Sequence, residues 1–235
     1  FKAFYPGPGV GGHCIPIDPF YLNWKTREYD YHTRLIELAG EINNSMPEFT
    51  VKRVMEILNR FGKPLNGAKV FQLGVAFKQD IDDLRHSPAL EVLENLEKHG
   101  ADLKYNDPFI PQFEFKGNEY NSSPLTTQNL KDADIVIITT KHQCYDYNFI
   151  QEYSKFIFDT KNAMKNVKTA INTLLLIFSK NFSPQKIIMT GDSLTGKCCG
   201  LRSSWFSPEK PASHLTGGFP LNFDCKVTLL QDWIT

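Results

Sequence analysis

A cysteine and an aspartate end a loop rich in glycine and proline near the start of the chain. The loop reads Tyr5-Pro-Gly-Pro-Gly-Val-Gly-Gly-His-Cys-Ile-Pro-Ile-Asp18. Glycines let a backbone approach a ligand closely and prolines lower the entropy cost of ordering it, so the amide groups can face an anionic or polyhydroxyl ligand. The thiol of Cys14 would then be placed as a nucleophile, and the carboxylate of Asp18 could position a hydrolytic water.

The same residues allow other interpretations. The string from Gly7 to Gly12 matches the G-x-G-x-x-G pattern of dinucleotide sites, but no β-branched strand precedes it and Pro16 interrupts the helix that should follow, so we do not assign that site. A turn that carries a buried, inert Cys14 stays open on residue types alone. Asp18 could also cap a helix that begins with Pro19.

Sequence segments well beyond the loop resemble one enzyme family. Gly-Pro-Gly-Val-Gly-Gly-His-Cys-Ile-Pro-Ile-Asp-Pro-Phe-Tyr-Leu resembles the catalytic-cysteine signature of the UDP-glucose/GDP-mannose dehydrogenase family, especially its UDP-N-acetylglucosamine 6-dehydrogenase branch. The resemblance continues through Glu37 to Asn43, Gly74 to Asp80, and Asp159 to Met164. It covers about residues 1–166 and leaves the rest unexplained.

Composition excludes several classes of partner. Lys plus Arg and Asp plus Glu both number 26 in the 235 residues, so no net field favours nucleic acid or an anionic membrane. Five cysteines without a regular framework indicate free thiols in a reducing compartment, and we expect a cytoplasmic protein. The longest apolar run, Leu174 to Phe178, is too short to span a bilayer, and no His/Cys spacing predicts a metal site.

Two amphipathic helices are expected after the loop. Apolar residues recur at helical spacing from His32 to Asn44 and again from Pro47 to Phe61, and Asn43 to Pro47 is expected to break the helix between them. These helices resemble the family's central dimerisation region, which implies a homo-oligomer.

From Lys69 onward the pattern changes to strands that alternate with helices, which predicts an α/β fold with a doubly wound, Rossmann-like parallel sheet. The expected strands are Lys69 to Phe77, Asp102 to Asn106, Ile135 to Thr139 and Phe156 to Phe158, and the expected helices are Ser87 to His99 and Phe149 to Tyr153. We therefore divide the chain into a cysteine loop with central helices (1–62), a UDP-sugar-binding domain (63–166) and a tail of uncertain fold (167–235).

Three cations follow the carboxyl ends of these strands. Ligands bind beyond the carboxyl ends of such sheets, so Lys78, Arg85 and Lys161 could converge on one crevice. Each of them, taken alone, is equally typical of a solvated surface. His13 is not expected to act as a base for Cys14, because adjacent residues of an extended loop point to opposite sides.

The resemblance implies an activity. It implies an NAD-dependent enzyme that oxidises the C6 hydroxyl of UDP-N-acetylglucosamine, or a related UDP-hexose, twice through a thiohemiacetal and a thioester on Cys14, for surface polysaccharide precursors. The alternative is a non-catalytic module that binds a sugar nucleotide and dimerises. The family's NAD-binding domain and its catalytic glutamate and lysine would lie upstream of Phe1, so the chain reads as a fragment that we expect to oxidise nothing alone.

The resemblance also implies residue roles. Cys14 and Asp18 would be catalytic, and the predicted sugar-nucleotide contacts are Tyr5, Gly7, Gly9, Gly11, Phe77, Lys78 and Lys161. The predicted cofactor contacts are Cys14, Ile15, Ile17 and Arg85. Lys161 departs from the family, which usually has arginine there, and lysine offers a point charge in place of a two-pronged donor.

The tail contains one look-alike motif. Residues 186–197 read as a strand followed by G-x-x-x-x-G-K, but Cys198 lacks the hydroxyl that would bind Mg²⁺, so we do not assign a P-loop. Cys198, Cys199 and Cys225 are interpreted as incidental thiols.

Overall fold

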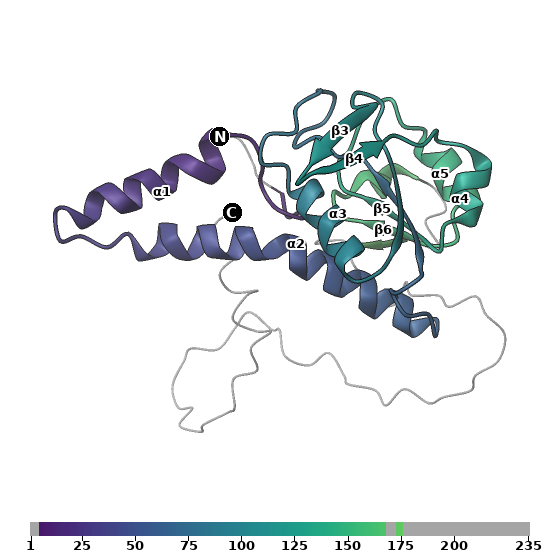
Figure 1. Cartoon of the computed structure of the whole chain (residues 1–235), viewed down its shortest axis with the longest axis horizontal. Helices are drawn as coiled ribbons and strands as arrows, with labels where there is room; N and C mark the ends of the chain where they lie inside the picture. Colours follow the sequence, from purple (N-terminus) through teal and green to yellow (C-terminus); the bar gives the residue numbers. More distant parts are fainter. Residues whose placement is uncertain (1–4, 168–172, 176–235) are drawn as a thin grey trace, which may run out of the picture. The chain divides into compact units, whose positions relative to one another are not determined.

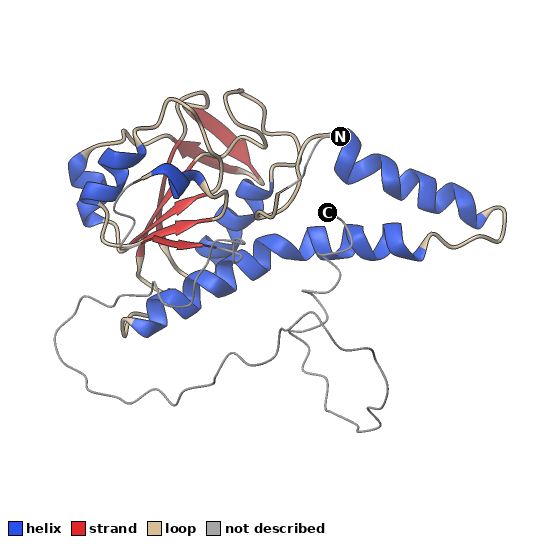
Figure 2. Cartoon of the chain, turned by 180° about the vertical axis from the view of Figure 1, so that it is seen from behind, coloured by secondary structure: helices blue, strands red, loops and turns tan. Residues whose placement is uncertain are grey.

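A parallel sheet of five strands lies at the centre of the described part of the chain, residues 5–167 and 173–175 of a computed structural model. The strands follow the order β2-β1-β5-β6-β7, and every neighbouring pair is parallel. Figure 2 shows the strands in red and the helices in blue. They are β1 (Lys69–Leu73), β2 (Asp102–Asn106), β5 (Ile135–Ile138), β6 (Ile157–Asp159) and β7 (Thr173–Leu175). The predicted doubly wound α/β class is confirmed, and β7 extends the sheet beyond residue 166.

Helices cover both faces of the sheet (Figure 1). They are α2 (Arg34–Arg60) and α3 (Pro88–Lys98) on one face, and α4 (Thr127–Asp132) and α5 (Tyr147–Tyr153) on the other. Alternate strand residues enter different clusters, since Val70 packs with α2 and α3 whereas Phe71 packs with α4 and α5. Both faces of the central strands are therefore buried, which is why they read as continuous apolar runs.

A two-stranded antiparallel hairpin lies outside the main sheet. It consists of β3 (Gln112–Phe115) and β4 (Asn118–Asn121), joined by Lys116 and Gly117 in left-handed conformations. The rings of Phe113 and Tyr120 stack with their centroids 4.9 Å apart. Sequence analysis did not predict this hairpin. A short 3₁₀ helix, η1 (Ala163–Asn166), follows β6.

The first helix begins earlier than expected. α1 (Cys14–Arg27) starts at the cysteine itself, with His13 as its N-cap residue and Pro19 inside the helix. The prediction that Asp18 caps a helix starting at Pro19 is therefore wrong, as is the inference that Pro16 prevents a helix. Pro16 is the third helical residue, where an N–H would have no acceptor within the helix, so this proline removes no helical hydrogen bond.

The second helix is continuous. α2 runs for 27 residues through Pro47, so the predicted break between Asn43 and Pro47 is wrong. Pro47 is buried, and the apolar residues that follow it, from Val51 to Leu58, pack into the core. This burial offsets the one hydrogen bond that Pro47 removes. No helix in the described part of the chain combines the length and the apolar composition that a bilayer span requires.

Candidate active site

The glycine-rich loop lies against the segment that follows β1. A Cβ atom at Gly11 would come within 2.7 Å of both the Phe77 Cβ and the His86 carbonyl oxygen, so only glycine allows this approach. Gly12 has a φ of +93° and lies over the Phe77 ring. Its N–H donates to the Arg85 carbonyl at 2.9 Å. Phe77 thus forms part of the surface on which the loop rests.

Lys161 lies at the other end of this loop. Its Nζ is 2.6 Å from where a Cβ atom of Gly7 would be, and the side chain is half-buried. Burial lowers the pKa of the Lys161 amine. Lys161 forms no ion pair with any residue from 5 to 167. An amine without a carboxylate partner, beside a loop of backbone amides, is suited to an anionic ligand.

Arg85 contributes both its backbone and its side chain. Its guanidinium is exposed and pairs with Asp83 at 2.7 Å. The pKa of Arg85 is raised mainly by the hydrogen bond to Asp83, and the nearby Cys14 adds a smaller contribution. The structure therefore brings the predicted residues Phe77, Arg85 and Lys161 together at the loop that leads to Cys14.

Cys14 is an exposed free thiol at the first residue of α1. The interpretation of a buried cysteine is therefore wrong, and the predicted role of Cys14 as a nucleophile stays a prediction. Asp18 is exposed and follows Cys14 by four residues in the helix, which places both side chains on one face. Ile15 is 51% exposed and Ile17 is half-buried, so the first turn of α1 presents an apolar surface beside the thiol.

Two predicted site residues are exposed and have no polar partner among the described residues. Lys78 is exposed beside Phe77, and Tyr5 is 85% exposed at the start of the loop. Neither forms an ion pair or a hydrogen bond with a described residue. Their predicted substrate contacts remain predictions.

A buried carboxylate and a histidine fix the strand ends beneath this site. Asp107 accepts hydrogen bonds from the N–H groups of Val75 and Ala76 after β1, and from the Nε2 of His142 after β5. The Nδ1 of His142 accepts from the N–H of Asp80. Burial alone would raise the pKa of Asp107, but the hydrogen bonds from His142 and from backbone amides lower it below its ordinary value.

This network holds the segment that carries Phe77 and Lys78. Asp80 and His86, which follow Phe77 and Lys78 in the chain, both have positive φ, a conformation that persists in non-glycine residues only where surrounding contacts impose it. Sequence reasoning missed the network because its members lie 31 to 62 residues apart. No group of three or more His, Cys, Asp and Glu side chains in the described segments is arranged to hold a metal ion.

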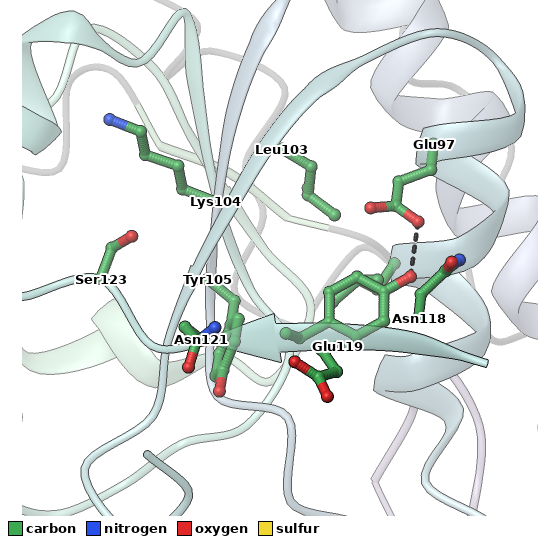
Figure 3. Close-up of a pocket in the computed structure, with 10 residues that line it drawn as sticks. Glu97, Leu103, Lys104, Tyr105, Asn118, Glu119, Asn121 and Ser123 are labelled. Atoms are coloured by element: carbon green, nitrogen blue, oxygen red, sulfur yellow. Dashed lines mark hydrogen bonds between the residues drawn. The ribbon is translucent and has the colours of Figure 1, made fainter. Parts of the chain in front are cut away.

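One pocket of the described fold lies away from this site. A pocket of about 510 Å³ is lined by α3, β2 and β4, and it contains none of the predicted site residues. Figure 3 shows Glu97 at its edge, where the carboxylate accepts a hydrogen bond of 2.6 Å from Tyr120. A second, apolar pocket of about 490 Å³ is formed by Pro16, Ile17, Phe20, Tyr21 and Trp24 on the helix that begins with Cys14.

The fold and site together define a class of protein: a Rossmann-like domain that is preceded by a cysteine loop and a helical hairpin. The UDP binding domain of the UDP-glucose/GDP-mannose dehydrogenase family matches residues 72–166, and the central domain of the same family matches residues 1–45. The chain belongs to the UDP-glucose/GDP-mannose dehydrogenase family.

Individual relatives agree with this assignment. The chain is 32% identical over 176 residues to UDP-N-acetyl-D-mannosamine dehydrogenase of Methanocaldococcus jannaschii, with 75% of this chain and 35% of the relative covered. It is 29% identical over 142 residues to UDP-N-acetyl-D-glucosamine 6-dehydrogenase of Pseudomonas aeruginosa, with 60% and 33% covered.

A solved structure is also similar. The UDP-D-ManNAc dehydrogenase of Pyrococcus horikoshii superposes with a TM-score of 0.62 at 27% identity, with 75% of this chain and 40% of that chain covered. The chain thus spans between a third and two fifths of the length of these relatives.

Proposed function

We propose that this chain is the substrate-binding and nucleophile-bearing part of an NAD-dependent UDP-sugar 6-dehydrogenase. The observation that carries the proposal is the arrangement of one loop. It leads to an exposed Cys14, rests on Phe77 and has beside it the amine of Lys161, which forms no ion pair with a described residue. The names of the relatives indicate a UDP-N-acetylhexosamine as substrate, either UDP-N-acetylglucosamine or UDP-N-acetylmannosamine.

In this proposal the loop and its neighbours bind the nucleotide end of the substrate. Lys161 and the loop amides would neutralise the diphosphate, and Phe77 would offer an aromatic surface. The sugar would then extend toward Cys14. Because Asp18 shares a helix face with Cys14, its carboxylate would accept a proton from the water that releases the product.

The residues described here would form only one edge of a cofactor site. Arg85, Cys14 and Ile15 are exposed and Ile17 is half-buried, and together they would fit against a bound dinucleotide. NAD would supply the oxidant in the form of a hydride acceptor.

In this proposal Cys14 carries the C6 carbon of the sugar covalently. Oxidation of the C6 alcohol to an aldehyde removes one hydride and one proton. Addition of the Cys14 thiol to that aldehyde gives a thiohemiacetal, and loss of a second hydride and a proton gives a thioester. Water then attacks the thioester, which releases the carboxylate and returns the thiol. The covalent link keeps the aldehyde from escaping into solvent.

UDP binding and protection of the thiol test the proposal. We expect UDP-N-acetylglucosamine at ten times its dissociation constant to slow alkylation of Cys14 by iodoacetamide about tenfold, by simple occupancy. Cys144, the other exposed thiol of the described chain, should react at an unchanged rate and serves as the internal reference. Peptide-resolved mass spectrometry measures both rates.

The Lys161→Ala variant extends this test. We expect it to weaken UDP binding about 10- to 100-fold in calorimetry, because it removes a charged hydrogen-bond donor. Lys165→Ala, an exposed lysine on η1, is the control and should bind UDP as the unaltered chain does. A chain that binds no UDP, or in which Cys14 and Cys144 are protected equally, would contradict the proposed function.

We also propose that the protein assembles through its two long helices. The helix α2 exposes an apolar stripe at helical spacing, Leu35, Leu38 and Ile42, and α1 exposes Leu22 and Trp24. Apolar faces of this kind are typical of interfaces. The alternative is that this apolar face packs against a further domain of the same protein. The exposed thiols of Cys14 and Cys144 support placing the assembly in the reducing cytoplasm.

A charge placed on this stripe should separate the subunits. We expect Leu38→Asp to reduce the oligomer to a monomer in sedimentation equilibrium at micromolar concentration, because a carboxylate would be buried without a partner. Lys52→Asp, on an exposed position of the same helix, should leave the molar mass unchanged. A monomeric unaltered chain would overturn the proposal that it assembles.

A further inference from the structure

One side-chain amide of α2 holds the backbone of the cysteine loop. The Oδ1 of Asn43 accepts a hydrogen bond from the Val10 N–H at 2.8 Å, and its Nδ2 donates to the Val10 carbonyl at 3.5 Å. The two residues are 33 positions apart, so this is a tertiary contact. An amide side chain carries a donor and an acceptor on separate atoms, so it can donate to a carbonyl and accept from an N–H of the same residue without carrying a charge.

The backbone carbonyl group of Asn43 also faces the loop. Pro47 lacks an N–H, so the carbonyl oxygen of Asn43, four residues earlier, does not accept the hydrogen bond that is usual at this helical spacing. That oxygen lies 3.5 Å from where a Cβ atom of Gly9 would be. The side chain and the backbone of Asn43 therefore both face the loop, at Val10 and at Gly9 respectively.

The other side of the loop is held by a different part of the fold. The N–H of Gly12 donates to the carbonyl of Arg85, two residues before Cys14. Val10 and Gly12 are thus fixed to α2 and to the segment between β1 and α3, and the chain enters α1 directly afterwards. The place where Cys14 begins its helix is set by these two attachments.

We propose that Asn43 is a positioning residue that sets the location of Cys14 relative to the sugar-nucleotide site at Phe77 and Lys161. This inference rests on the proposed function. Without the Asn43 amide, Val10 would lose its attachment to α2 while the site residues on the sheet side stay in place. A UDP-sugar would then still bind through its nucleotide end, but its sugar would no longer lie over the thiol of Cys14.

Three variants test this role. Asn43→Ala removes both hydrogen bonds, and Asn43→Asp keeps an acceptor for the Val10 N–H but places an oxygen against the Val10 carbonyl. Asn44→Ala, at the adjacent exposed position of the same helix, is the matched control. Alanine is the best helix former, so neither alanine variant should disturb α2.

The expected result separates binding from alignment. In Asn43→Ala we expect UDP to bind within about threefold of the unaltered chain, while the protection of Cys14 by saturating UDP-N-acetylglucosamine falls about tenfold, equivalent to about 1.4 kcal/mol. Asn43→Asp should lose part of the protection and Asn44→Ala none. Thermal unfolding followed by circular dichroism should differ little among the three.

Two outcomes overturn the inference, and they are distinguishable. If the unaltered chain binds UDP and protects Cys14, and Asn43→Ala protects it equally, Asn43 does not position the thiol. If Asn43→Ala instead lowers the unfolding midpoint and UDP affinity together with protection, its role is structural only. A failure of the unaltered chain to bind UDP would overturn the proposed function itself, and this inference with it.

Discussion

Gly74→Ala is expected to destabilise the fold by about 4 kcal/mol, the sum of a strained backbone and an overpacked contact. Gly74 directly follows β1, is buried and has a φ of +83°. A Cβ atom there would lie 2.5 Å from the Thr140 Cβ and 2.8 Å from the Thr140 carbonyl oxygen. Because the obstacle includes backbone of the neighbouring strand end, no rotamer change can relieve it. Urea denaturation followed by circular dichroism measures the loss.

Gly67→Ala is the matched control for this prediction. Gly67 has a similar φ of +75°, but a Cβ atom there would have nothing within 4 Å. It should therefore lose only the backbone contribution, about 1 kcal/mol. Equal losses for the two variants would show that close packing at Gly74 does not limit the position of the segment that carries Phe77.

Asp107→Asn should cost about 3 kcal/mol of folding free energy, although it changes the side-chain volume very little. The carboxylate accepts from Val75, Ala76 and His142 through one oxygen and from Phe109 through the other. An asparagine amide has only one acceptor oxygen. Its NH₂ group would take the place of the other carboxylate oxygen and would face an N–H donor. UDP affinity should fall with it, since the network supports the segment that carries Phe77.

The pH dependence of this effect has a definite sign. The pKa of Asp107 is lower in the folded chain than in the unfolded chain, so its contribution to stability is fully present above the unfolded value of about 3.9. The contribution is lost as the pH falls through the folded pKa. The difference between the unaltered chain and Asp107→Asn should therefore persist from neutrality to about pH 4 and shrink below it.

The matched control is Asp82→Asn, an exposed carboxylate on the segment between β1 and α3. It should leave the denaturation midpoint unchanged at every pH. If Asp107→Asn were equally mild, the buried network would not be what supports the strand ends, and the positions of Asp80 and His86 would need another cause.

The sheet was predictable because its residues carry the signal locally. β2 coincides with the predicted strand, and β5 differs from its prediction by one residue, because apolar and β-branched runs between turn residues define them. Pro88 at the start of α3 and Gly100 after it also behave as expected. Arg85 and Lys161 both lie against the cysteine loop, whereas the predicted convergence of Lys78, Arg85 and Lys161 on one crevice stays a prediction.

Other features depended on contacts that local patterns do not contain. Pro16, Pro19 and Pro47 were interpreted as helix boundaries, yet each lies within a helix. In α2, tertiary packing decides the outcome: the buried residues after Pro47 hold the helix across it. Asn43, Asp107 and His142 were missed for a related reason, since their partners are distant in sequence. The predictions for Cys198, Cys199, Cys225 and the motif ending at Lys197 lie outside the described residues.

The helix α2 fixes a spacing as well as a surface. Asn43 contacts the cysteine loop, and the residues from Val51 to Leu58 pack into the core. The seven residues between Asn43 and Val51 therefore determine the distance and the rotation between these two contacts. Each residue of a helix turns the chain by about 100° and advances it by about 1.5 Å. A single insertion in that stretch would turn the amide away from the loop. The length of this stretch is therefore constrained, whereas its exposed positions, such as Asn44 and Glu48, are free to vary.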